Sequence, residues 1–348
     1  MSDIHIRLAG QAGRITLQRP EALNAITYEM CSAIEDALER WRDDPLVKLI
    51  VIDALGDRAF CAGGDIADLY ATGTAGDFGF GQTFWADEYR LNALIASYPK
   101  PYVAFMQGFT MGGGVGISCH GSHRIVGQSS QIAMPECGIG LVPDVGGSHI
   151  LANAPGNLGA YLGLTTARMS AADAIYIGFA DAFIPEENWE EAKESLEASG
   201  EVETLLRFYN TAPPGALRAT RSHIDAWFEG TDLAEIVARL KAASEAEAER
   251  ALSMLSRSSP LSLACTLHIL HHLKISRADL SEALTWEYRF TARSMEHGDF
   301  LEGIRAAIID KDRAPKWKHQ LTNVPQEAIS SMLASLEQGE LNIGRERK

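Results

Sequence analysis

The sequence predicts an α/β fold in which strand–loop–helix units are followed by a helical C-terminal region. Up to about residue 185, short apolar runs alternate with segments whose apolar residues keep helical spacing, and this alternation is typical of α/β architecture. Two of these units resemble each other, because LIVIDA is followed by CAGGD, and YVAFMQG by TMGGGVG. After residue 200 the strand signal disappears. The chain is therefore expected to have an α/β core over residues 1–200 and a helical region over residues 201–348.

The N-terminal elements follow from local patterns. Residues 4–8 and 14–18 are apolar or alternate in polarity on either side of a glycine-containing turn, which predicts a hairpin. Residues 28–41 keep apolar side chains at helical spacing, and Thr27 can cap this helix. Residues 49–52 form a short apolar run that predicts a strand.

The middle of the chain is richer in glycine. Asp65 occupies a plausible capping position before a short helix, and the segment from Gly73 to Gly81 predicts a mobile loop. A helix over 84–98 is expected to end at the prolines that follow it, and a strand over 102–105 comes next. Further strands are expected at 123–126, 131–134 and 180–184, and further helices at 158–164, 171–177, 189–196, 217–229, 232–256, 262–274 and 279–309.

Composition and charge narrow the class of protein. With 348 residues, of which 46% are hydrophobic, the chain can bury a large core. The 46 acidic and 31 basic residues give a formal net charge of −15, which argues against general nucleic-acid binding but leaves room for a polyanionic small ligand. Five cysteines without a CxxC pairing fit a reducing compartment, and neither a signal peptide nor a membrane-spanning run is recognisable. A cytoplasmic protein without a membrane partner is expected.

One stretch, from Gly108 to Gly147, combines a glycine cluster with two acids. Glycine lets backbone N–H groups approach a ligand closely, and at a helix start these groups are unpaired and carry the positive end of the helix dipole. Such groups suit an anionic oxygen. Glu136 and Asp144 follow among apolar neighbours, where a carboxylate can transfer a proton or attack a carbonyl. The stretch therefore predicts an oxyanion site with acids beside it.

Four motifs extend this interpretation to nearly the whole chain. They are FCAGGDI, GFTMGGGVGIS, AMPECGIGLVPDVGG and DFLEGIRAAIIDKDRAPKW, in this order. Together they resemble the crotonase (enoyl-CoA hydratase/isomerase) superfamily, and PDVGG with EGIRAAIIDKD resembles its 3-hydroxyisobutyryl-CoA hydrolase branch. The resemblance implies a crotonase-like spiral of ββα repeats followed by a helical region, and an acyl-CoA ester as substrate. Because CoA is part of that substrate, no separate cofactor is expected.

The resemblance also assigns binding positions. The backbone N–H groups of Gly64 and Gly113 would bind the thioester oxygen, where preorganised donors typically stabilise the transition state by on the order of 3–4 kcal/mol each. Backbone groups in the loops that precede and contain FCAGGDI would hold the adenine and pantetheine of CoA. The substrate-binding positions of these loops are Leu23, Ala62, Gly63, Asp65 and Ile66.

The implied catalytic positions differ from those of the superfamily's hydratases. In those enzymes a glutamate stands at the position of Gly116, and adding water to a double bond needs it together with the acid at the position of Glu136. The hydrolase branch matches instead at Glu88, Gly113, Glu136 and Asp144. Glu136 would attack the thioester carbonyl or activate a water, and both routes stay open. Asp144 would orient the water or the acyl hydroxyl, and Glu88 would shape the acyl pocket.

Simpler interpretations compete with these roles. Asp144 could cap a helix that begins after it, Glu88 could lie on a solvated helix face, and Asp65 is more readily a cap than a catalyst. The three histidines of residues 268–272 share helical spacing, but no acid or cysteine joins them at ligand spacing, so no metal site is expected.

Three functions remain in competition. The first is hydrolysis of an acyl-CoA thioester, most simply 3-hydroxyisobutyryl-CoA in valine breakdown, and PDVGG with the DFLEGIRAAIIDKD segment favours it. The second is hydration or Δ3–Δ2 isomerisation of an enoyl-CoA, and the third is non-catalytic binding of CoA esters. Glu136 and Asp144 argue against the third, since a binding module needs neither. Assembly into a homo-oligomer is possible in each case.

Overall fold

The computed structural model describes residues 3–337 and 339–344. The chain forms two compact units, and each draws on three separate stretches of sequence. The first unit comprises Met1–Asp65, Arg90–Ala133 and Arg168–Arg218, and the second comprises Ile66–Tyr89, Met134–Ala167 and Ala219–Lys348. The predicted division into an α/β core and a helical region near residue 200 was based on the end of the strand signal, and it stays a prediction.

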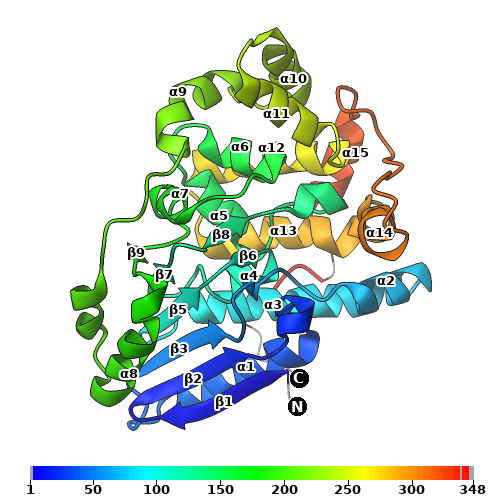
Figure 1. Ribbon diagram of the computed structural model, residues 1–348. Coiled ribbons are helices and arrows are strands. Elements are labelled where there is room, and N and C mark those ends of the chain that lie inside the picture. Colours follow the sequence, from blue (N-terminus) through cyan, green and yellow to red (C-terminus); the bar gives the residue numbers. More distant parts are fainter. Residues whose placement is uncertain (1–2, 338, 345–348) are drawn as a thin grey trace. The chain divides into compact units, whose positions relative to one another are not determined.

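The first unit contains a six-stranded sheet in the order β1-β2-β3-β5-β7-β9 (Figure 1). β1 and β2 form the predicted antiparallel hairpin, and the other neighbouring pairs are parallel. The strands of this sheet are β1 (Ile4–Ala9), β2 (Ala12–Leu17), β3 (Leu49–Ala54), β5 (Tyr102–Met106), β7 (His123–Val126) and β9 (Ala182–Phe183).

A second, three-stranded parallel sheet of the first unit explains the repeat in the sequence. Its strands are β4 (Ala59–Cys61), β6 (Phe109–Met111) and β8 (Gln131–Ala133), in that order. Each follows a strand of the larger sheet in the chain, and a helix comes after each pair. The predicted spiral of ββα repeats is therefore confirmed. Of these three-residue strands, β8 was predicted at 131–134, whereas β4 and β6 were not, because so short a strand gives little periodicity and their segments were interpreted from their glycines instead.

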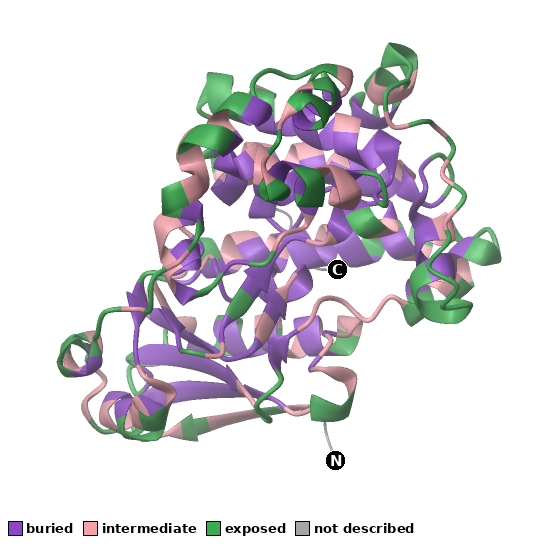
Figure 2. Cartoon of the chain, turned by 45° about the horizontal axis from the view of Figure 1, so that its top comes forward, coloured by how far each residue is buried: buried purple, intermediate pink, exposed green. Residues whose placement is uncertain are grey.

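One face of the larger sheet packs against α8 (Trp189–Ser199) and η4 (Val202–Phe208). Successive strand residues point to opposite faces, so alternate residues of each strand enter this core. Its strand residues include Leu49 and Val51 of β3 and Val103 and Phe105 of β5. In Figure 2, β2 and β5 are buried throughout, whereas β1 at the sheet edge has intermediate and exposed residues.

The helices of the first unit begin largely where predicted. Thr27 precedes α1 and its side-chain oxygen accepts a 3.2 Å hydrogen bond from the N–H of Met30, which confirms the predicted cap. The next helix has Ile66 as its N-cap residue, and Asp65 pairs with Arg19 at 3.0 Å, so the cap predicted at Asp65 stays a prediction. The helices of this unit are η1 (Pro20–Ala22), α1 (Tyr28–Arg42), α4 (Gly113–Gly116), α7 (Ala171–Ile177), η3 (Glu186–Asn188), α8 and η4.

The second unit is built from helices over the residues that the structure describes. They are α2 (Ala67–Thr74), η2 (Glu136–Ile139), α5 (Gly147–Ala152), α6 (Leu158–Thr165), α10 (Leu233–Ala242), α11 (Ala246–Leu255), α12 (Pro260–Ser276), α13 (Leu280–Ser294), α14 (Phe300–Ile304), the π-helical turn η5 (Arg305–Ile309) and α15 (Gln326–Leu333). Two further helices, α3 (Phe78–Ala96) and α9 (Leu217–Trp227), contribute residues to both units.

Three sequence expectations in this part are corrected. The predicted loop over 73–81 is mostly helical, because α2 continues to Thr74 and α3 begins at Phe78. Its glycines serve packing, since a Cβ at Gly73 would overlap the side chain of Leu301. The predicted helix 232–256 is two helices separated at 243–245, and 279–309 is interrupted between α13 and α14.

The described part of the chain contains no helix that is a candidate for spanning a membrane. Within those residues, no helix combines the length and the apolar character that crossing a bilayer requires.

Candidate active site

Four carboxyl groups gather in the second unit. Glu88 lies on α3, Glu136 opens η2, Asp144 precedes α5, and Glu287 lies on α13. Each is buried, with relative exposures of 3%, 4%, 5% and 0%, respectively. Charged carboxylates are costly to bury, so such a group raises the pKa values of its members and marks a candidate site for proton transfer or nucleophilic attack.

Within the described chain, Glu136 has one carboxylate oxygen that is free of hydrogen bonds. Its Oε2 atom is buried and has no hydrogen-bond partner among the described residues. Burial, and next the charge of Asp144, raise the pKa of Glu136 well above its usual value. A carboxylate oxygen without a partner keeps its lone pairs free for a proton or a carbonyl carbon. Glu136 therefore fits the predicted role of nucleophile or general base.

The side chain of Asp144 is held by a hydrogen bond from Tyr89. The hydroxyl of Tyr89, on α3, donates a 2.8 Å hydrogen bond to Oδ2 of Asp144 and lies 3.4 Å from Oγ1 of Thr291. Burial raises the pKa of Asp144 to about 6, although the Tyr89 hydrogen bond opposes this shift. The expectation that Asp144 could cap α5 is not met, because Gly146 is the N-cap residue.

Glu88 does not lie on a solvated helix face. It is buried beside these acids, and burial, followed by the charge of Asp144, raises its pKa well above the usual value. The structure thus brings together the three acids that the sequence singled out, Glu88, Glu136 and Asp144. Their catalytic and substrate-binding roles stay predictions.

Glu287 belongs to this group but was not predicted. Its carboxylate accepts hydrogen bonds from the N–H of Gly146 at 2.8 Å and the N–H of Ser148 at 3.1 Å, and from the hydroxyl of Ser148. Burial raises its pKa to about 8, and the bonds from Ser148 and Gly146 oppose the shift. A signal did exist: Glu287 shares the buried spacing of Ala283 and Thr291 on α13, where an acid is out of place.

The turn that carries Glu136 is fixed by two distant glycines. Gly140 ends η2 with φ of 82°, and a Cβ there would meet the backbone of Asp299 at 2.5 Å. Reciprocally, a Cβ at Gly303 of α14 would overlap the backbone of Ile139. The N–H of Ser259 donates to the carbonyl of Cys137 at 2.9 Å. The motifs ECGIG and DFLEG therefore interlock.

The predicted oxyanion glycines lie in the first unit. Gly63 has φ of 122° and Gly112 has φ of 48°, conformations that favour glycine, and they precede Gly64 and Gly113, respectively. A Cβ at Gly114 would overlap the carbonyl of Cys61, so the two glycine loops lie side by side. Within residues 3–337 and 339–344, no hydrogen bond engages the N–H of Gly64 or of Gly113. Both amides are therefore available to donate to an oxygen, and their role as oxyanion donors stays a prediction.

The predicted CoA positions of the first unit also lie close together. The N–H of Ala62 donates a 3.0 Å hydrogen bond to the carbonyl of Leu23, which has φ of 52°. Gly63 follows Ala62 and its carbonyl accepts from the N–H of Ile26 at 2.9 Å. Asp65 follows with its Arg19 ion pair. Ile66, the remaining member of this set, directly precedes α2 of the second unit. Binding of CoA by these residues stays a prediction.

Two of the histidines of α12 have partners of their own. His268 and His272 pack on the ring of Trp286, and Nε2 of His272 lies 2.8 Å from Oε1 of Glu282. Across the described chain, no group of three or more His, Cys, Asp or Glu side chains has an arrangement that could hold a metal ion.

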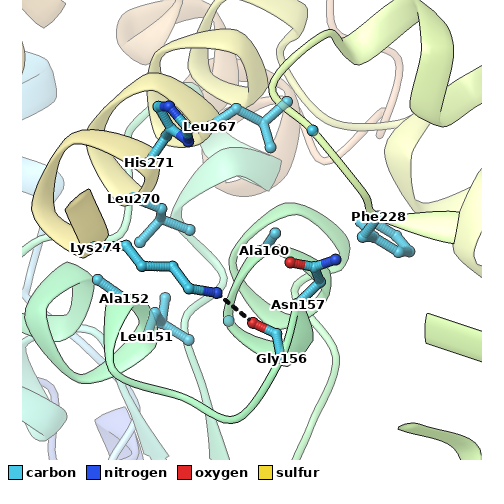
Figure 3. Close-up of a pocket in the computed structure, with 12 residues that line it drawn as sticks. Leu151, Ala152, Gly156, Asn157, Ala160, Phe228, Leu267, Leu270, His271 and Lys274 are labelled. Carbon is cyan, nitrogen blue, oxygen red and sulfur yellow. Dashed lines mark hydrogen bonds between the residues drawn. The ribbon is translucent and has the colours of Figure 1, made fainter. Parts of the chain in front are cut away.

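A small pocket of about 60 Å³ lies elsewhere in the second unit (Figure 3). Lys274 and His271 of α12 face α6 across it, and Nζ of Lys274 donates a 2.6 Å hydrogen bond to the carbonyl of Gly156. None of the four buried acids lines this pocket. It is therefore separate from the candidate active site.

The sequence profile described as enoyl-CoA hydratase/isomerase matches residues 12–333. Proteins named "3-hydroxyisobutyryl-CoA hydrolase, mitochondrial" are similar over almost their full length. That of Danio rerio is 38% identical over 354 residues, which cover 98% of this chain and 92% of the relative. That of Homo sapiens is 36% identical over 353 residues, which cover 98% and 91%.

Two solved structures share the fold. An enoyl-CoA hydratase from Rhodobacter sphaeroides 2.4.1 superposes with a TM-score of 0.95 at 56% identity and covers 98% of this chain and 100% of its own. A carnitinyl-CoA dehydratase from Mycobacterium thermoresistibile has a TM-score of 0.94 at 37% identity and covers 99% and 100%. The chain belongs to the enoyl-CoA hydratase/isomerase family, the crotonase superfamily.

Proposed function

We propose that the chain is an acyl-CoA thioester hydrolase that converts 3-hydroxyisobutyryl-CoA and water into 3-hydroxyisobutyrate and CoA, a step of valine breakdown. One observation of the site carries the proposal: Glu136 is buried, has an unpaired carboxylate oxygen and lies among other acids. The similarity to relatives named 3-hydroxyisobutyryl-CoA hydrolase, at 36–38% identity over 98% of the chain, supports the same substrate.

The reaction breaks the acyl C–S bond and needs a group that acts on the carbonyl carbon. Glu136 either attacks this carbon, forming a mixed anhydride that water then hydrolyses, or removes a proton from a water that attacks it directly. In both routes CoA leaves as a thiolate and takes up a proton. Because a thiolate is a good leaving group, no strong acid has to protonate it. A single glutamate is therefore sufficient.

The other predicted residues take supporting roles in this proposal. Asp144 orients the water or the 3-hydroxyl of the acyl group, and Glu88 hydrogen-bonds that hydroxyl. The N–H groups of Gly64 and Gly113 stabilise the negative charge that develops on the carbonyl oxygen. Substrate and water supply every atom of the reaction, so we propose that no cofactor takes part. A cytoplasmic location and assembly into a homo-oligomer remain parts of the proposal.

Hydration of an enoyl-CoA is the second candidate. One observation favours it, since the similar structure from Rhodobacter sphaeroides carries the name enoyl-CoA hydratase at 56% identity. Hydration needs one group to activate water and another to protonate carbon. The family position of the first acid is Gly116 in this chain, and glycine has no side chain that can take part. The hydrolase is therefore the better-supported function.

A panel of CoA esters separates these functions when free thiol is measured with a colorimetric disulfide reagent. Thiol release from 3-hydroxyisobutyryl-CoA, with little release from crotonyl-CoA, is the expected result. Loss of enoyl absorbance from crotonyl-CoA without thiol release would establish the hydratase instead. Binding of both esters with neither reaction would refute catalysis and leave a CoA-ester binding protein.

A further inference from the structure

Glu287 has no assigned role, yet it is the least accessible of the four acids. It lies in the middle of α13 with 0% exposure. A carboxyl group in such a place is unfavourable unless hydrogen bonds compensate for its lost solvation. The hydrogen-bond partners of Glu287 therefore indicate its role.

The partners of Glu287 all belong to one short segment that starts two residues after Asp144. They are the N–H of Gly146, and the N–H and hydroxyl of Ser148. Gly146 is the N-cap residue of α5 and has no side chain with which to satisfy the free N–H groups of that helix. Glu287 accepts from the N–H groups of Ser148 and Gly146 from another helix, 139 and 141 positions away in sequence.

The backbone of this segment is left-handed at two consecutive residues. Val145 and Gly146 both have positive φ, 51° and 78°. A left-handed conformation is unfavourable for a β-branched residue such as Val145, and surrounding contacts have to maintain it. The N–H of Gly147 donates to the carbonyl of Asp144 at 2.7 Å, so the turn that includes Asp144 is continuous with the amides that Glu287 binds.

We propose that Glu287 is a positioning residue that holds the turn 144–148, and thereby sets the place of the Asp144 carboxylate. The inference rests on the proposed function for its consequence in catalysis. Tyr89 binds Oδ2 of Asp144 at 2.8 Å from one side, and Glu287 fixes the backbone from which Asp144 extends. The side chain and main chain of Asp144 are thus anchored by two different helices, α3 and α13.

The experiment compares E287Q with E282Q. The amide introduced by E287Q would keep one acceptor oxygen, but its NH₂ group would face one of the two backbone N–H donors. Glu282 is a matched control, because it lies on the same helix and its side chain contacts His272, outside the turn. Crystal structures of both variants are determined, and kcat and KM are measured with 3-hydroxyisobutyryl-CoA.

The expected result for E287Q is a displaced turn, a distance above about 3.5 Å between the Tyr89 hydroxyl and Asp144, and kcat lowered about tenfold or more with KM nearly unchanged. E282Q should keep the hydrogen bond between Tyr89 and Asp144 and the kcat of the wild type. An E287Q structure with the turn and the Tyr89 contact in place would overturn the proposal. So would a loss of rate that merely follows the loss of folded protein.

A second variant covers the case in which E287Q does not fold. S148A removes the hydroxyl donor and keeps both backbone donors, so it should shift the turn less and lower kcat by a smaller factor. An unchanged turn together with an unchanged kcat in S148A would count against the proposal. If the wild type releases no thiol from any ester, the proposed hydrolase function is refuted. The crystal structures of the variants still test whether Glu287 positions Asp144.

Discussion

The hydroxyl of Tyr89 lies 2.8 Å from Oδ2 of Asp144, and both side chains are buried. A hydrogen bond to an ionised group is stronger than one between neutral groups, so it favours the charged form of the aspartate. Because burial acts in the opposite direction and is the larger effect, the pKa of Asp144 settles at about 6. The phenol of Tyr89 is therefore one of the groups that set the ionisation of this acid.

Removal of that phenol gives the first prediction. In Y89F the pKa of Asp144 should rise, because the opposing hydrogen bond is lost, and more Asp144 should be protonated at neutral pH. A hydrogen bond to a charged group contributes on the order of 1.5–3 kcal/mol, and one pKa unit corresponds to about 1.4 kcal/mol. The acid limb of the pH–rate profile should therefore move upward by about one to two pH units. Y288F is the control, because the Tyr288 hydroxyl donates to the carbonyl of Gln82. Equal profiles for Y89F and Y288F would contradict the prediction.

The second prediction concerns Glu136 itself. E136Q keeps the size of the side chain but removes the group that attacks the carbonyl or takes the proton. Turnover should fall by at least about 100-fold, while the dissociation constant for the CoA ester stays nearly the same. Thiol release gives the rate and titration calorimetry gives the affinity. A variant that works at near full rate would show that the role assigned to Glu136 is wrong.

The third prediction links function to stability. Burial raises the pKa of Asp144 from 3.8 to about 6, so the folded state binds this proton more tightly than the unfolded state. The resulting stability is fully present below pH 4 and is lost as the pH rises through about 6. A shift of this size corresponds to about 3 kcal/mol. D144N, whose amide oxygen can still accept from Tyr89, should therefore be more stable than the wild type at pH 8 and not at pH 4. Urea denaturation at the two pH values measures this, and an equal effect at both would refute it.

The fourth prediction tests the packing of η2. A methyl group at Gly303 would overlap the backbone of Ile139, so G303A should destabilise the protein by on the order of 1–3 kcal/mol and also lower kcat, because η2 carries Glu136. G138A on the same turn is the matched control, since a Cβ there has no heavy atom within 4 Å among the described residues. Similar denaturation midpoints for the two variants would argue against the interlock.

Local chemistry made part of this structure predictable. The cap at Thr27 and the hairpin β1–β2 depend on residues close in sequence, and both are confirmed. Glu136 and Asp144 could be chosen because acids in an apolar, glycine-broken segment are unusual. Their burial is in keeping with that choice, and their catalytic roles stay predictions.

What escaped prediction depends on contacts between distant residues. The glycines of 73–81 suggested a loop, but Gly73 and Gly81 give room to the side chains of Leu301 and Met295, which lie more than 200 positions away. From the sequence alone Glu287 is indistinguishable from a surface charge on a helix, because its partners Gly146 and Ser148 lie far away in sequence. A pattern confined to one segment contains no information about such a partner.

The interlock of Gly140 with Asp299 and of Gly303 with Ile139 also has a temporal consequence. During synthesis the segment that carries Glu136 leaves the ribosome more than 160 residues before α14 does. Until α14 has emerged, the turn has no surface to close against. The chain should therefore gain its catalytic competence only after α14 has emerged, and a nascent chain released before that point should lack it.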